Sequence, residues 1–178
     1  MKNSVLLFAL LLSVSSMWAQ LTNLSSVSAN FLNASATTSE LTLGMTNKTT
    51  KSGTEVTVDV YNQNMAEVLS MQYSMKWNPK VLKFKEVRQF GLPALSKDNF
   101  GKHLTPKGQL TIAWYDENLR GLSIPAGQVL YQLVFEVVGK AGDKAFINIV
   151  DYPTVIEVSN PAGQIIDLKG GVGTIKIQ

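Results

Sequence analysis

The chain has 178 residues, 45% of them hydrophobic and 16% charged, which predicts one globular domain and excludes a disordered or low-complexity polymer. It contains no cysteine, which excludes disulfides, thiolate metal sites and a cysteine nucleophile, and its single histidine, His103, excludes a two-histidine metal site. The 16 basic and 13 acidic residues give a net charge of +3, too small an excess to indicate a nucleic-acid-binding protein.

The first twenty residues have the order of an export signal. Lys2 supplies a positive charge, and residues 5–12 form an apolar core that is shorter than the roughly 20 residues of a membrane-spanning helix. Ala19 places a small residue at a cleavage site. We therefore expect residues 1–20 to be a signal peptide, removed near Ala19 or Gln20, and the protein to be secreted. The alternative is a buried N-terminal helix.

The next segment differs from both of its neighbours in composition. Residues 20–39 carry no charge, and 11 of these 20 residues are Ser, Thr or Asn. Such a composition is typical of a flexible linker. We expect residues 21–39 to be a spacer, followed by one domain at 40–178. No segment after the signal is long and apolar enough to be a membrane span.

From Glu40 onward, apolar and polar residues alternate with a period of two, the pattern of strands with one buried face. No sustained helical period occurs. The short alternating runs are separated by turn residues and predict an all-β protein, a jelly-roll-like antiparallel β-sandwich of about nine strands. The expected strands lie near residues 41–45, 54–62, 68–77, 81–87, 109–115, 128–138, 144–150, 154–159, 164–168 and 172–177. The expected core includes Val58, Met71, Tyr73, Trp77, Phe84, Ile112, Trp114, Leu133 and Phe135.

The order of these strands and turns resembles a cohesin domain, a family related to carbohydrate-binding module families 2 and 3. Residues 51–60, KSGTEVTVDV, resemble the family's opening strand, and Trp77-Asn78-Pro79 stands where the family has an aromatic-Asp-Pro turn. Residues 108–118, 124–142 and 170–177 resemble three later strands and their turns. The resemblance implies a β-sandwich and a non-catalytic module of a bacterial extracellular or cell-envelope protein, which binds a dockerin-like partner.

The resemblance also implies that a partner lies across one flat sheet face. The matching strands are 70–77, 109–116 and 129–137, and alternation places one set of side chains outward on them. The partner-binding residues predicted in this way are Ser70, Gln72, Ser74, Thr111, Ala113, Tyr115, Asp116, Gln132 and Glu136. An aromatic residue near the centre of such a polar face, here Tyr115, is a common interface hot spot. An ordinary solvated sheet face is the alternative.

No residue pattern indicates catalysis or a cofactor. His103 lacks the partners of a catalytic triad, and we expect it on the surface. Asp116 and Glu117 could share a calcium ion, but no calcium-loop motif surrounds them, so we expect a solvated loop end. The glycines at 170, 171 and 173 lack the strand-before, helix-after context of a dinucleotide loop.

Two features leave a carbohydrate ligand open as the alternative function. The densest basic run, which could attract an acidic partner or polysaccharide, consists of Lys76, Lys80, Lys83, Lys85 and Arg88. Such runs more often form a solvated face. The aromatic residues that could stack on sugars are Trp77, Trp114 and Tyr115, of which alternation turns the two tryptophans inward. We therefore expect a protein-recognition module rather than a carbohydrate-binding module or an enzyme, with no metal or cofactor.

Overall fold

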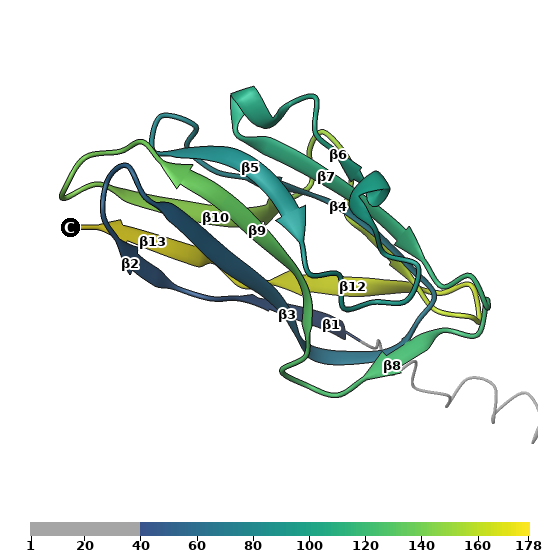
Figure 1. Ribbon diagram of the computed structural model, residues 1–178. Helices are drawn as coiled ribbons and strands as arrows, with labels where there is room; N and C mark the ends of the chain where they lie inside the picture. The colour runs from purple at the N-terminus through teal and green to yellow at the C-terminus, as the bar shows by residue number, and fades with distance from the viewer. Residues whose placement is uncertain (1–39) are drawn as a thin grey trace, which may run out of the picture. The chain divides into compact units, whose positions relative to one another are not determined.

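The computed structural model describes residues 40–178 (Figure 1). The expected signal peptide and spacer fall on residues 1–39 and lie outside the described residues. Within the described part of the chain, no helix is long and apolar enough to cross a membrane.

The predicted all-β class is confirmed. The strands are β1 (Glu40–Met45), β2 (Lys48–Thr50), β3 (Glu55–Val68), β4 (Ser70–Lys76), β5 (Leu82–Arg88), β6 (Phe100–Gly101), β7 (Gln109–Tyr115), β8 (Leu122–Ile124), β9 (Val129–Val137), β10 (Lys144–Val150), β11 (Glu157–Ser159), β12 (Ile165–Gly170) and β13 (Gly173–Ile177). Two short 3₁₀ turns, η1 (Lys97–Asn99) and η2 (Thr105–Lys107), interrupt the irregular segment between β5 and β7.

The strands form two layers that pack face to face (Figure 1). The first layer has the order β5–β9–β3–β1–β12, with β8 paired to β3. The second layer is centred on β4, which pairs with β7 along one edge and with β10 and β11 along the other, while β6 extends the layer beyond β7. The layers are joined where β11 pairs with β12, and β13 and then β2 continue the second layer beyond β10.

The structure has three more strands than the ten expected runs, and the additional ones, β2, β6 and β8, have only two or three residues each. β10 and β11 both lie along the same edge of β4, and residues 151–156 leave the sheet between them. β12 and β13 are separated in the same way by residues 171–172. The strands are also not all antiparallel: β1 runs parallel to β12, and β2 runs parallel to β13.

The core lies between the two layers. Every predicted core residue is buried except Phe84, which is half-buried at the edge and packs against Trp77 and Phe135 with ring centroids 6.0 Å away in each case. Trp77 and Phe135 meet edge to face at 5.1 Å. In the middle of the core, the hydroxyl groups of Tyr73 on β4 and Tyr131 on β9 form a hydrogen bond of 2.6 Å that links the two layers.

Candidate functional site

The outer face of β4 and β7 brings together residues that the sequence predicted as neighbours. The two strands pair in the register Ser70↔Tyr115 and Gln72↔Ala113, and Thr111 lies one step further along β7. Their inward neighbours, such as Tyr73 and Trp114, are buried in the core, so strand alternation leaves these five side chains on the outside. Tyr115 is the most prominent of them, with 57% of its surface exposed.

Ser74 lies on the same side of β4 but is fully buried, which corrects its prediction as an accessible contact residue. Its hydroxyl oxygen accepts a hydrogen bond of 2.8 Å from the backbone N–H of Thr154 and donates one of 2.9 Å to the Thr154 carbonyl. The segment between β10 and β11 therefore folds over Ser74. Alternation identifies the side of a strand correctly, but it does not reveal that a distant loop covers that side.

Asp116 is also buried and is not available to a partner. Its carboxylate accepts hydrogen bonds from the backbone N–H groups of Asn118 and Arg120 and from the Asn118 side chain. The backbone N–H of Asn118 contributes most to lowering the pKa of this carboxyl below its usual range. Asp116 thus fixes the loop after β7, and the expectation that it forms a solvated loop end is wrong.

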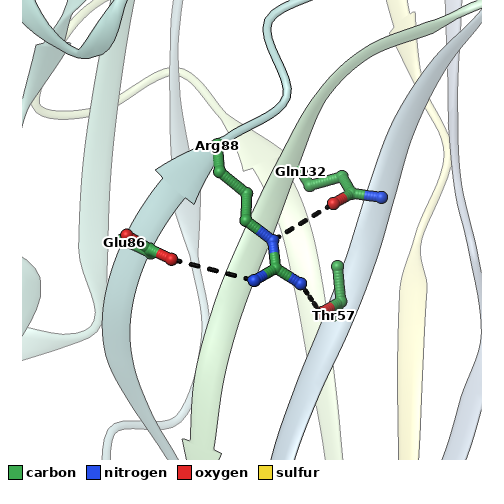
Figure 2. A network of polar contacts seen from close by, with 4 residues as sticks. All are labelled: Thr57, Glu86, Arg88 and Gln132. Carbon is green, nitrogen blue, oxygen red and sulfur yellow. Dashed lines mark hydrogen bonds and ion pairs between the residues drawn. The ribbon is translucent and has the colours of Figure 1, made fainter.

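Gln132 and Glu136 do not belong to this face, because β9 lies in the other layer, between β3 and β5. Figure 2 shows Gln132 in a polar network with Arg88, whose Nε donates to Gln132 Oε1 and whose Nη2 donates to Thr57. Glu86 completes the network through an ion pair with Arg88 at 3.8 Å.

The same outer surface of the first layer holds Glu136, which forms an ion pair of 3.5 Å with Lys83. Gln132 also donates a hydrogen bond of 2.7 Å to Asp59. The polar groups of this surface therefore contact one another. The sequence analysis assigned β9 to the wrong sheet, because alternation gives the inward side of a strand and not its neighbours.

The β11–β12 hairpin adds residues that the sequence analysis did not include. Ser159 pairs with Ser70 on one side and with Ile165 on the other, which makes a row across four strands from Ile165 on β12 to Tyr115 on β7. The Ser70 and Ser159 hydroxyl oxygens lie 2.7 Å apart in a hydrogen bond. Ile165 is 63% exposed at the far end of the row. The sequence pattern predicted Ile165 as a strand residue, because it follows a turn that contains glycine. The pattern did not show that this strand pairs with β11.

A shallow depression of about 310 Å³ lies next to this row. Its walls come from β4, β7, β11 and the turn before β6, where the Asn99 side chain donates to the Ala113 carbonyl. Glu157 is the one charged residue that lines it. We call the surface formed by Ser70, Gln72, Asn99, Ala113, Tyr115, Glu157, Ser159 and Ile165 the recognition face.

The other candidate chemistry is dispersed. His103 is exposed in the irregular segment before β7, as expected, and residues 40–178 hold no group of three His, Asp or Glu side chains arranged to bind a metal. The basic run does not form one patch. Lys83 and Arg88 are in ion pairs on the first layer, whereas Lys76 lies on the second layer.

Comparison with known proteins identifies the family. The cohesin-domain family model matches residues 39–177. The chain belongs to the cohesin family. Cohesins are non-catalytic protein-binding modules. No curated protein matches the chain.

Several solved cohesins have the same fold. The sixth cohesin of scaffoldin B from Acetivibrio cellulolyticus, solved in complex with a Cel5 dockerin mutant, is 16% identical, with a TM-score of 0.63 over 79% of this chain and 100% of that one. The third cohesin of ScaC from the same organism, in complex with the ScaB dockerin, is 15% identical, with a TM-score of 0.64 over 77% and 98% of the chains. A non-cellulosomal cohesin from the archaeon Archaeoglobus fulgidus is 20% identical, with a TM-score of 0.59 over 79% and 92%.

Proposed function

We propose that this cohesin is a secreted, non-catalytic module that binds a dockerin-like protein through the recognition face. The observation that carries the proposal is the row Ile165–Ser159–Ser70–Tyr115, in which two exposed side chains flank a pair of hydrogen-bonded serines. Secretion is supported by the expected signal peptide at residues 1–20.

The composition of the face suits a protein partner. Tyr115 and Ile165 expose apolar surface that a partner can bury. Exposed aromatic or aliphatic residues surrounded by mostly uncharged side chains are common hot spots of protein interfaces. The serine hydroxyls already satisfy each other, so a partner that covers them breaks few hydrogen bonds to water. The first layer offers a weaker candidate surface, because its charged side chains already contact one another.

A carbohydrate ligand on this face has less support. This face has no lysine or arginine among the residues that line its depression, so it would hold a sugar mainly by stacking, which one exposed aromatic ring supports only weakly. Trp77 and Trp114 are buried, and the indole N–H of Trp114 donates a hydrogen bond of 2.7 Å to the Pro93 carbonyl in the core. Tyr115 stands without a second exposed aromatic ring on β4 or β7.

The proposal is tested by capturing dockerin-containing proteins from the secreted fraction of the producing organism, and by comparing folded variants. Tyr115→Ala and Ile165→Ala should each weaken binding by about 2 kcal/mol, or roughly thirtyfold, as expected for hot-spot residues. Gln72→Ala, within the depression, should have a smaller effect. Val172→Ala is the matched control, because Val172 is an exposed aliphatic residue between β12 and β13, outside the face. Undiminished capture by Tyr115→Ala and Ile165→Ala, with melting temperatures unchanged, would place the binding site elsewhere.

A further inference from the structure

A second surface with different chemistry lies where β4, β10 and β13 meet, and we call it the basic corner. It is formed by outward side chains from strands far apart in the sequence: Lys76 on β4, Lys144, Phe146 and Asn148 on β10, and Thr174 and Lys176 on β13. The register pairs Asn148 with Lys76, Phe146 with Thr174, and Lys144 with Lys176. Their neighbours Ala145, Ile147 and Ile175 are buried, which fixes these side chains on the outside.

The charge of the basic corner is not balanced by nearby acids. Lys144 and Lys176 lie directly opposite each other on antiparallel strands, an arrangement of like charges that is unfavourable in a sheet. Both ion pairs found among residues 40–178 lie on the first layer and use none of these lysines. Fixed, unpaired positive charge of this kind attracts anionic ligands.

Two neighbouring depressions lie in this surface. One, of about 390 Å³, is lined by Lys76, Asn78, Lys144, Phe146 and Asn148 together with Trp77 and Ala145. The other, of about 270 Å³, is lined by Asn47, Lys48, Thr49, Thr174 and Lys176. Because Phe146 pairs with Thr174 and Lys144 pairs with Lys176, the two depressions are neighbours on one face. Neither is lined by an acidic residue.

Neutral hydrogen-bonding groups surround the lysines. The side chain of Asn148 and the hydroxyls of Thr49 and Thr174 form no hydrogen bond with any residue from 40 to 178. Asn47 and Asn78 each use only the side-chain oxygen, which accepts from the N–H of Thr174 and of Lys80, so their amide donors point to no protein acceptor in that part of the chain. These groups complement a ligand rich in hydroxyls.

Phe146 completes the surface. It is 51% exposed between Lys144 and Asn148, and its ring can lie against the apolar face of a sugar. An extended ligand that crosses from one depression to the other would contact an aromatic ring, two lysines and several amide and hydroxyl groups.

We propose that the basic corner binds an acidic polysaccharide whose sugar carboxylates pair with Lys144 and Lys176. An acidic peptide would also pair with the lysines, but it would leave many of the surrounding side-chain amide and hydroxyl groups without a hydrogen-bond partner. The proposal concerns strands β10 and β13 and does not rest on the function of the recognition face. The two surfaces have separate anchors, Phe146 for the polysaccharide and Tyr115 for the protein partner.

The test measures binding of residues 40–178, or of the full chain, to polygalacturonate, alginate and hyaluronate by affinity electrophoresis and titration calorimetry. We expect binding to at least one of these, weakened by added salt, and no binding to fully methyl-esterified polygalacturonate, which keeps the sugar and lacks the charge. The double variant Lys144→Gln/Lys176→Gln should bind about tenfold more weakly, since each exposed charge contact contributes up to about fivefold. Phe146→Ala should also weaken binding, without changing the salt dependence.

The matched control is Lys85→Gln/Lys102→Gln, which removes the same net charge from two exposed lysines that line neither depression. It should change the affinity less than twofold, while all variants keep the melting temperature of the parent. Equal losses in both double variants would show attraction to net charge alone and overturn the proposal. Absence of binding to all three polysaccharides would overturn it too, as would equal or tighter binding to polyglutamate, which would assign the surface to acidic peptides.

Discussion

The paired tyrosines in the core show how a buried polar contact can join two sheets. Tyr73 and Tyr131 are both fully buried, their hydroxyl oxygens are 2.6 Å apart, and the Tyr131 hydroxyl also donates to the Met75 sulfur at 3.5 Å. Burial raises the pKa of both phenols above the usual range, so they stay neutral. The sequence predicted Tyr73 as a core residue, but it carried no signal that its hydroxyl would meet that of Tyr131.

This geometry predicts unequal effects for two matched substitutions. Tyr131→Phe removes the one hydrogen-bond partner that the buried Tyr73 hydroxyl has among residues 40–178, and it should reduce the free energy of unfolding by about 1–3 kcal/mol. Tyr73→Phe leaves the Tyr131 hydroxyl bonded to the Met75 sulfur and should cost less. Urea denaturation of both variants and of the double variant measures this. A larger loss for Tyr73→Phe than for Tyr131→Phe would contradict the assignment of donors.

The buried carboxylate of Asp116 predicts a pH-dependent stability. Its hydrogen bonds to Asn118 and Arg120 lower the pKa in the folded state, so the unfolded state takes up a proton first as the pH falls. The stabilisation is therefore present above the unfolded pKa of about 3.9 and is lost as the pH falls through the lower folded pKa. Asp116→Asn should be less stable than the parent at neutral pH, and this difference should shrink in acid.

Thermal melting between neutral and strongly acidic pH checks this expectation. Glu117→Gln is the control, because Glu117 is exposed beside Asp116. It should melt like the parent at every pH. A constant difference between Asp116→Asn and the parent across the whole range would show that the carboxylate charge is not what holds the loop.

Single strands were easier to predict than the pairs they form. In β4 the alternation from Ser70 to Lys76 correctly separated Met71, Tyr73 and Met75, which are buried, from Ser70 and Gln72 on the other side. The pairing of β4 with β7 followed from the resemblance. The position of β9 did not follow, because a strand buried on one side satisfies the same pattern in either layer.

The sharing of one edge by two strands was also outside the reach of the sequence pattern. Residues 144–150 and 154–159 gave separate alternating runs, yet both lie on the same edge of β4 and the chain between them covers Ser74. The hydrogen bonds that hold this loop join residues 80 positions apart. Local periodicity carries no information about contacts at that separation, so the recognition face could be predicted only in part.

Ser74 should control the opening of the loop at 151–156. Ser74→Ala removes both hydrogen bonds to the Thr154 backbone and should lower the local stability of the loop by about 1–2 kcal/mol. The amide hydrogen of Thr154 should then exchange at least about fivefold faster. Hydrogen exchange followed by NMR measures this. Ser70→Ala on the same strand is the matched control, because the Ser70 hydroxyl is hydrogen-bonded to that of Ser159 and, among residues 40–178, not to Thr154. Unchanged protection of Thr154 in Ser74→Ala would mean that other contacts hold the loop.

At the scale of the whole molecule, the outer surfaces of the two layers are chemically distinct. The first layer presents charged side chains that pair with one another, around Arg88 and Lys83. The second layer presents the exposed ring of Tyr115, with Ile165 exposed where β12 meets β11, and it presents lysines outside these ion pairs at the basic corner. Exposed apolar area is costly to leave in water, and exposed unpaired charge attracts ligands of the opposite charge, so both are features that interaction surfaces use. Binding is thus expected on one side of the sandwich.

The first twenty residues predict that the protein is exported from the cytoplasm. Lys2, the apolar residues 5–12 and Ala19 predict export followed by cleavage near Ala19 or Gln20, so mass spectrometry of the native protein should show loss of roughly the first 20 residues. Replacing the small residue at the cleavage site, in Ala19→Leu, should leave an uncut precursor, while Ser39→Leu in the expected spacer should be processed normally. Material from the medium or cell envelope that retains Met1 would show that this segment is not a cleaved signal.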